Sequence, residues 1–222
     1  MLGAHGGYTF YALNNGKIDK AYIVDGYITP ATEAEAQKYP QLNLISGQPG
    51  DADIARKVGP VDAIIMFDII LHQVAPDWDA FLEMWGSQCK YLIIYNQNWA
   101  KDDKVVRFAD FDVDWFIKNV SHSNDDSVRS WYQKHDNFNE ELGCKWRDVH
   151  YFWQFGIPLK SLVEKLEKLS FTIDYVAHDT PWSVQYPWVT NDVILASRSE
   201  SGAVSRERKG IFEGVRQLYG KR

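Results

Sequence analysis

The 222-residue sequence has few cysteines, no excess of positive charge and no long uninterrupted hydrophobic run. Cys89 and Cys144, its two cysteines, have neither metal-site nor redox-motif spacing, which favours reduced thiols in a cytoplasmic protein over a disulfide. The net charge of −6 argues against a general nucleic-acid-binding protein. The longest apolar stretch, residues 61–74, is interrupted by Asp62, Asp68 and two further polar residues. We therefore expect neither a transmembrane segment nor a signal peptide, and no membrane partner.

Metal-binding patterns are also missing. The six histidines show no ligand spacing. Asp110, Asp112 and Asp114 resemble the start of a calcium-binding loop, but Trp115 replaces the glycine and Ser121 the glutamate that such a loop needs. The sequence therefore predicts no metal site.

The sequence does contain enough apolar residues, 45% of the chain, for one folded α/β domain with a sizeable core. Strand-like and helix-like segments alternate through the first hundred residues, which is typical of a parallel sheet with right-handed crossovers. The predicted strands are residues 22–24, 42–45, 63–67 and 91–95. The predicted helices are residues 31–38, 51–58 and 77–88.

The pattern changes in the second half of the chain. Residues 99–157 are irregular and rich in tryptophan, and we interpret them as an insertion that covers the ligand-binding edge of the sheet. Residues 158–169 have the spacing of an amphipathic helix, and residues 171–177 and 192–197 are predicted to be a closing antiparallel pair of strands. We expect one domain over residues 1–198, followed by a basic tail, residues 199–222, that is either a solvated helix or a partner-docking element.

A glycine-rich turn, Gly3-Ala4-His5-Gly6-Gly7, lies near the start of the sequence, and Asp25 ends the next predicted strand. In open α/β sheets this pairing holds an adenosyl ligand, because glycine lets the backbone approach the ligand while the carboxylate accepts hydrogen bonds from ribose hydroxyls. A nicotinamide-dependent oxidoreductase is a less favoured alternative, since it would need Gly-x-Gly-x-x-Gly.

Together these segments resemble the class I S-adenosylmethionine-dependent methyltransferases. The resemblance rests on the glycine turn, Asp25, the run Val61-Asp62-Ala63-Ile64-Ile65-Met66-Phe67-Asp68-Ile69-Ile70-Leu71-His72, and the helix start Ala75-Pro76-Asp77-Trp78. It covers roughly residues 1–98 and 158–198. It implies a doubly wound, mostly parallel, Rossmann-like α/β sheet with an antiparallel C-terminal hairpin, S-adenosyl-L-methionine as cofactor, and methyl transfer as the activity.

The sequence departs from the family at its start. The family's glycine turn follows a hydrophobic strand that ends in an acid, whereas Met1 stands at the acid's position here, and His5 occupies a position often held by glycine. We therefore expect a truncated form of a longer protein that lacks the first strand. Such a sheet would be marginally stable, or would borrow a strand from a partner in a homodimer.

The resemblance implies a set of cofactor-binding residues at the ends of the strands. Asp25 would bind the ribose, Gln48 or Asp51 would lie near the adenine, and Phe67 and Asp68 would face the cofactor and the substrate. The turn would contribute Gly3, His5 and Gly7. Each residue has a plainer alternative: an ordinary turn for the glycines, a solvated acid for Asp25, a helix cap for Asp51 and core packing for Phe67.

Two histidines are candidate bases for O-methylation, which requires removal of a hydroxyl proton. We predict His150, oriented by Asp148, in the first place and His72 in the second. The alternatives are a solvated loop for His150 and a packing role for His72. The aromatic insertion suits a small acceptor such as a sugar, whose rings have apolar faces. The alternative function is a methyltransferase-like binding or scaffold protein without catalysis.

Overall fold

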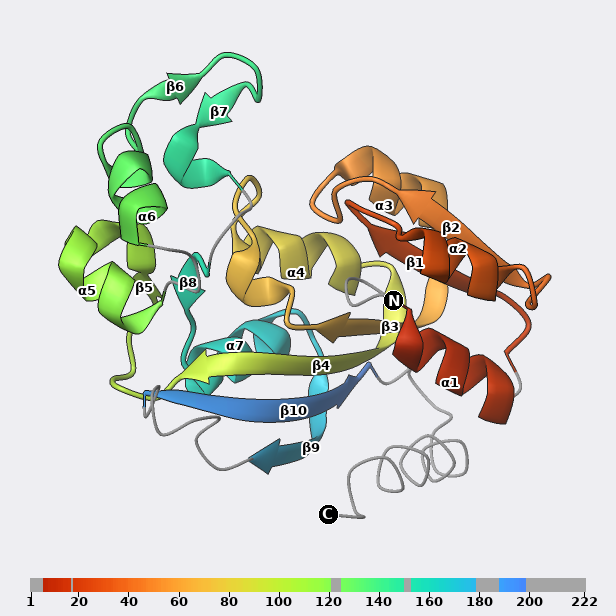
Figure 1. The fold of residues 1–222 in the computed structure, drawn as a ribbon. Helices are drawn as coiled ribbons and strands as arrows, with labels where there is room; N and C mark the ends of the chain where they lie inside the picture. Colours follow the sequence, from red (N-terminus) through yellow and green to blue (C-terminus); the bar gives the residue numbers. More distant parts are fainter. Residues whose placement is uncertain (1–5, 17, 121–124, 150–152, 179–187, 199–222) are drawn as a thin grey trace.

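The computed structural model describes residues 6–16, 18–120, 125–149, 153–178 and 188–198, and strands β3, β4 and β10 run across the middle of the molecule (Figure 1). Strands β1 (Ala21–Asp25) and β2 (Leu42–Ser46) pair in parallel. A second group has the order β3-β4-β10-β9. In the described residues, no strand joins β1 to β3.

The second group of strands contains both directions. Strand β3 (Val61–Phe67) lies parallel to β4 (Cys89–Trp99), and β10 (Val189–Ser197) runs antiparallel to β4 over its whole length. Strand β9 (Thr172–His178) forms the outer antiparallel partner of β10. The carboxyl ends of β3, β4 and β9 therefore lie at one edge of the sheet, as the alternation and the predicted closing hairpin require.

Five helices connect or flank these strands: α1 (Gly7–Asn15), α2 (Pro30–Ala36), α3 (Ala52–Val58), α4 (Trp78–Gly86) and α7 (Leu159–Lys168). Local sequence sets their boundaries. The Thr29 hydroxyl accepts a hydrogen bond from the Thr32 amide at the start of α2, and the Asp51 carboxylate caps α3 in the same way. Helix α3 ends at Gly59, whose φ of 70° is a conformation that glycine adopts without strain.

The main core lies between the sheet and helices α4 and α7. Phe81 and Trp85 of α4 and Leu162 of α7 pack with Leu92 and Ile94 of β4 in one buried cluster. Each such side chain contributes about 1.5–3 kcal/mol when it leaves water. The Trp85 indole also donates a 2.8 Å hydrogen bond to a backbone oxygen in the loop before α3, which ties this core to the first strand pair.

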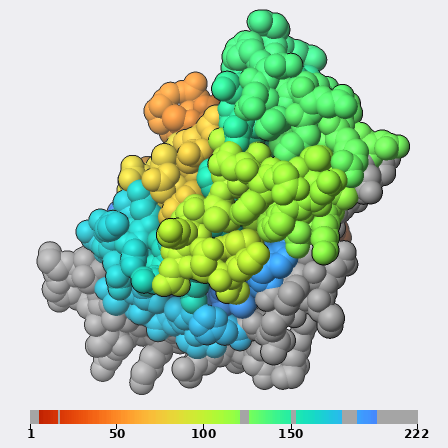
Figure 2. All heavy atoms as spheres, turned by 90° about the vertical axis from the view of Figure 1, so that its left-hand side faces the viewer, coloured from red at the N-terminus to blue at the C-terminus, as the bar shows by residue number. Residues whose placement is uncertain are grey.

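Residues between β4 and α7 form a separate small subdomain. It contains α5 (Val113–Asn119), α6 (Asp125–Tyr132) and four two-residue strands: β5 (Val106–Arg107), β6 (Phe138–Asn139), β7 (Cys144–Lys145) and β8 (Phe155–Gly156). Strand β5 near the start of the subdomain pairs with β8 near its end, which brings the two ends of the subdomain together. Its own core centres on Phe108 and Phe116. Figure 2 looks onto the edge toward which β4 points in Figure 1, and residues of this insertion cover much of that face.

The α/β alternation predicted from the sequence is confirmed. Strand β4 is longer than the predicted 91–95, because polar residues up to Asn98 continue the ladder with β10. Cys89 and Cys144 are free thiols. Within the described ranges, no helix has the length and apolar character needed to cross a membrane. The predicted basic tail lies outside the described residues.

Candidate functional site

Gly6, the described part of the glycine turn that directly precedes α1, packs against β1. Gly6 has a φ of 75°, and a Cβ at this position would lie 2.7 Å from Ile23 Cδ1, so a larger residue would strain the turn. Gly7 begins α1, is exposed, and has no heavy atom within 4 Å of where its Cβ would be. An open backbone at a helix N-terminus gives a ligand close access. Gly3 and His5 lie outside the described residues.

Asp25 ends β1 at the same edge of the sheet. One of its carboxylate oxygens accepts a 3.0 Å hydrogen bond from the Tyr27 amide, which fixes the side chain at the strand end. Gln48 is exposed and lies against Gly26, next to Asp25. Asp51 accepts a 2.7 Å hydrogen bond from the Asp53 amide, so the helix-cap interpretation of Asp51 has direct geometric support.

Three aromatic side chains meet where β3 and β4 end. The Tyr8 ring from α1 stacks on Phe67, with centroids 4.1 Å apart and planes at 14°. Phe67 lies 5.9 Å from Tyr95, its partner across the ladder. Tyr8 is exposed whereas Phe67 is buried. Residues from α1, β3 and β4 thus form one aromatic surface beside the glycine turn.

Asp68 follows Phe67 and has the most unusual environment among the predicted site residues. Its φ of 48° is left-handed, a rare conformation for a residue other than glycine. Its Oδ1 is buried without a hydrogen-bond partner, and the backbone N–H of Gln97 donates to its carboxyl group. Burial raises the pKa of Asp68 to about 6. A backbone outlier and a desolvated carboxyl group at a sheet edge together indicate a functional site.

The predicted bases, His150 and His72, receive less structural support than Asp68 for a catalytic role. His72 is half-buried on the short 3₁₀ helix Ile70–His72. Asp148 forms an ion pair with Arg107, so a cation of β5 engages the carboxylate that we predicted to orient His150. His150 itself lies outside the described residues. Its catalytic role stays a prediction, as does that of His72.

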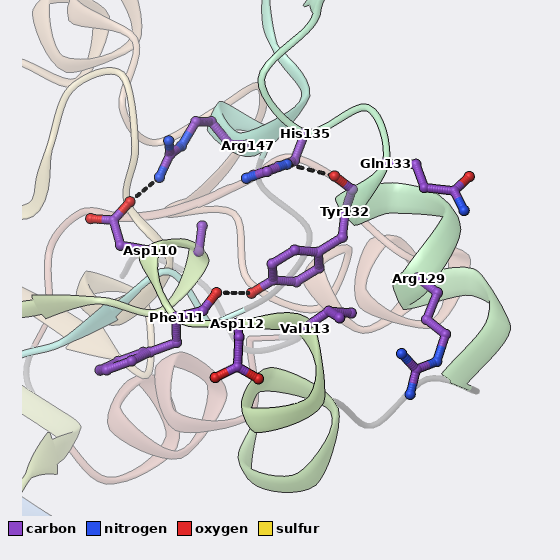
Figure 3. A pocket seen from close by; sticks show the side chains of 10 residues that line it. Asp110, Phe111, Asp112, Val113, Arg129, Tyr132, Gln133, His135 and Arg147 are labelled. Atoms are coloured by element: carbon purple, nitrogen blue, oxygen red, sulfur yellow. Dashed lines mark hydrogen bonds and ion pairs between the residues drawn. The ribbon is translucent and has the colours of Figure 1, made fainter.

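An open pocket of about 610 Å³ lies within the insertion, between α5 and α6 (Figure 3). Both arginines of its lining are engaged in ion pairs: Arg147 with Asp110 and Asp136, and Arg129 with Asp114. The Tyr132 hydroxyl bonds the backbone oxygen of Phe111 at 3.2 Å, and burial raises its pKa, so it remains a donor. These contacts hold the insertion together. In the described residues, no cluster of three or more His, Cys, Asp or Glu side chains could hold a metal ion.

No family model matches the chain, and no curated protein does. Several solved structures do match the chain. The N-terminal domain of EvdMO1, in the presence of SAH and D-fucose, is 14% identical with a TM-score of 0.54 over 90% of this chain and 74% of that one. A putative S-adenosylmethionine-dependent methyltransferase from Listeria monocytogenes is 15% identical with a TM-score of 0.53 over 90% of both chains.

A third match is 1,6-didemethyltoxoflavin-N1-methyltransferase from Burkholderia thailandensis, at 13% identity and a TM-score of 0.54 over 90% of this chain and 70% of that one. The chain has the class I methyltransferase fold. In an open α/β sheet such as this methyltransferase fold, ligands bind beyond the carboxyl ends of the strands. Gly6, Asp25, Phe67 and Asp68 all lie at that edge.

Sequence reasoning missed two further residues at this edge of the sheet, on β4 and β10, the two strands that follow β3 in the sheet order. Gln97 of β4 and Asn191 of β10 face each other across the ladder, and each has a buried side-chain oxygen without a hydrogen-bond partner. One signal was present in the sequence: Asn96, Gln97 and Asn98 are three amides that directly follow an apolar strand. The pairing with Asn191 required the register of β10.

Proposed function

We propose that the chain is an S-adenosylmethionine-dependent methyltransferase that acts on a small molecule. The observation that carries this proposal is the convergence of the glycine turn, Asp25 and the Phe67-Asp68 pair at one edge of a class I methyltransferase fold. Two structures with this fold support it, one described with SAH and D-fucose and one with SAH and 1,6-didemethyltoxoflavin.

The residues at this edge fit the cofactor. The open backbone at Gly7 gives it close approach, and Asp25 has a carboxylate oxygen left for ribose hydroxyls after its bond to Tyr27. The exposed ring of Tyr8, held by its stacking on Phe67, offers a π face to a sulfonium cation. When bound, the cofactor would supply a methyl group on positively charged sulfur. The protein would align the acceptor with that methyl group and exclude water.

The finer part of the proposal is O-methylation of a sugar or a similar acceptor. The insertion that covers the edge is rich in aromatic side chains, and Trp99, Trp153 and Trp188 lie together in its core beside the strand ends. Sugar rings pack on such side chains through their C–H faces. A hydroxyl acceptor also needs a base at this edge, and Asp68 joins His150 and His72 as a candidate.

Calorimetry with S-adenosylhomocysteine and NAD tests the cofactor assignment. We expect S-adenosylhomocysteine to bind more tightly than NAD. Asp25→Ala should weaken its binding by about 2 kcal/mol, or about thirtyfold, because hydrogen bonds to a charged group are lost. Asp62→Ala, at the opposite end of β3, is the matched control and should leave binding unchanged. Equal or tighter binding of NAD would rule out the methyltransferase assignment.

A binding or scaffold protein without catalysis is the alternative function. Calorimetry alone does not separate the two, because both predict cofactor binding. Transfer of a radiolabelled methyl group to an acceptor does separate them. Tight binding of S-adenosylhomocysteine together with no transfer to any member of a broad sugar panel would favour the scaffold.

A further inference from the structure

Three neighbouring strands present oxygen atoms without hydrogen-bond donors at the carboxyl edge of the sheet. These atoms are Asp68 Oδ1 after β3, Gln97 Oε1 on β4 and Asn191 Oδ1 on β10. The great majority of buried polar atoms in folded proteins have a partner, and an unpaired one costs about 1–3 kcal/mol. Three unpaired acceptors side by side therefore call for an explanation, and a ligand that donates hydrogen bonds supplies one.

The register of the sheet places the three residues in a row. Gln97 is paired with Asn191 across the β4–β10 ladder, so their side chains lie on the same face. The backbone N–H of Gln97 donates to the Asp68 carboxyl group, which places Asp68 beside β4 on the side away from β10. Neighbouring strands are about 4.8 Å apart, so the row spans about 10 Å, roughly the width of a ring with its substituents.

One member of the row borders a small aromatic cavity. Gln97 lines a cavity of about 10 Å³, the space of a single water molecule, together with Trp99, Trp153, Trp188 and Phe108, so a ring would bind beside these side chains and not inside the cavity. The Trp99 indole nitrogen is buried and has no hydrogen-bond partner, so it adds a donor to the row's acceptors. Asp68 and Gln97 are only half-buried as residues, so small rotations of their side chains can bring the oxygens to a ligand. Hydrogen-bond acceptors beside aromatic faces suit a ring with several hydroxyl groups.

We propose that Asp68, Gln97 and Asn191 bind the acceptor, that the acceptor is a ring with neighbouring hydroxyl groups, and that Asp68 takes the proton of the hydroxyl that is methylated. This inference rests on the proposed methyltransferase function. Gln97 and Asn191 determine specificity, because an acceptor without a hydroxyl at either position leaves a buried oxygen unpaired. A protonated amine fits less well, since the row has one carboxyl group and two neutral amides.

With Asp68 as the base, each bond, electron pair and proton of the methyl transfer has a destination. The acceptor oxygen forms a bond to the methyl carbon while the bond from that carbon to sulfur breaks, with both electrons left on the now neutral sulfur. The acceptor's O–H proton passes to Asp68 Oδ1 and later leaves to solvent. A carboxylate whose pKa is raised to about 6 is a stronger base than an exposed one and is still ionised at neutral pH.

Binding of D-fucose to the protein saturated with S-adenosylhomocysteine tests the row, with saturation-transfer NMR as the readout. We expect Gln97→Met and Asn191→Leu each to weaken D-fucose binding about tenfold. Gln133→Met, in the exposed pocket of the insertion, is the matched control and should bind D-fucose normally. Cyclohexanol and cyclohexylamine serve as a single-hydroxyl and an amine probe, and both should bind more weakly than D-fucose.

Methyl transfer to D-fucose tests the role of Asp68. We expect Asp68→Asn to lower turnover by about 10²–10⁴-fold while D-fucose and S-adenosylhomocysteine still bind. Turnover of the unmodified protein should fall as the pH drops through about 6, because Asp68 becomes protonated. That acid limb should be absent from the residual activity of Asp68→Asn, a difference that a merely structural role would not produce.

The outcomes separate this inference from the proposed function. Failure of the unmodified protein to bind S-adenosylhomocysteine would refute the methyltransferase function. The row is refuted as the acceptor site if the protein binds S-adenosylhomocysteine normally and Gln97→Met and Asn191→Leu still bind D-fucose as tightly as the unmodified protein. Loss of D-fucose binding in Gln133→Met would refute it as well. No D-fucose binding, or tighter binding of cyclohexylamine, would refute the acceptor class, and full turnover of Asp68→Asn would refute the base.

Discussion

Strands β4 and β10 bury polar side chains on both faces of the sheet, and Asp192 on one face is fully hydrogen-bonded whereas Gln97 and Asn191 on the other are not. On the face that packs on α4 and α7, Asp192 is fully buried and has a partner for each carboxyl oxygen. Its partners are His178 at 2.6 Å, Asn98 at 2.8 Å and Thr190 at 2.8 Å. On the opposite face, Gln97 and Asn191 have buried oxygens without a donor.

The contrast is informative because the two sets are sequence neighbours on the same strands. Asn98 follows Gln97 and Asp192 follows Asn191, so the chain positions are nearly equal; Gln97 is half-buried, whereas the other three residues are buried. A carboxylate with a donor at each oxygen, as at Asp192, holds a structure together, although Asn96 Oδ1 on the same face is also buried without a partner. Acceptors left unpaired at a ligand-binding edge cost stability and are retained for binding. The predicted effects on stability should therefore be opposite on the two faces.

The largest expected effect is that of Asp192→Ala. The change removes the shared acceptor of His178, Asn98 and Thr190 and leaves the buried side-chain amide of Asn98 without an acceptor. We expect the free energy of unfolding to fall by about 3–5 kcal/mol, measured by urea denaturation. Asp174→Ala on β9 is the control and should cost less than about 1 kcal/mol. A loss no greater than that of the control would show that the network does not stabilise the sheet.

The second effect is a gain in stability from Asp68→Asn at high pH. Burial raises the pKa of Asp68 from 3.8 to about 6, so folding favours the protonated form. Ionisation of Asp68 therefore costs stability, and this cost is absent below pH 4 and complete above about pH 7. Asparagine stays neutral, so the variant should be more stable than the unmodified protein by about 2 kcal/mol at pH 8 and nearly equal to it at pH 4.

Thermal unfolding at the two pH values measures this difference. Asp62→Asn, an exposed carboxylate at the start of β3, should show no such pH dependence. A destabilised Asp68→Asn at pH 8 would mean that the carboxylate has a stabilising partner, and the unpaired oxygen would then not be available to a ligand.

The sequence predicted the strands and helices that surround this site better than it predicted the polar residues within the site. Apolar periodicity and turn residues were enough to place β1 to β4, α3, α4 and α7, because these signals are local. Phe67 and Asp68 were found because they end a strand. Gln97 and Asn191 could not be found, since their meeting depends on the register of strands almost a hundred residues apart. Similarly, Asp148 pairs with Arg107 through a contact between β5 and a distant turn, which no local pattern reveals.

The smallest expected effect is a difference between two adjacent residues, Gln97 and Asn98. Asn98→Leu removes a donor to Asp192 and an acceptor for Asn96, so the free energy of unfolding should fall by about 1–2 kcal/mol. Gln97→Met removes a buried oxygen that has no partner and keeps the side chain's length, so stability should stay within about 0.5 kcal/mol or rise. Urea denaturation of both variants with equal m-values measures the difference. Equal losses would show that Gln97 contributes as much to stability as Asn98 does. The contrast between the two faces of the sheet would then no longer hold.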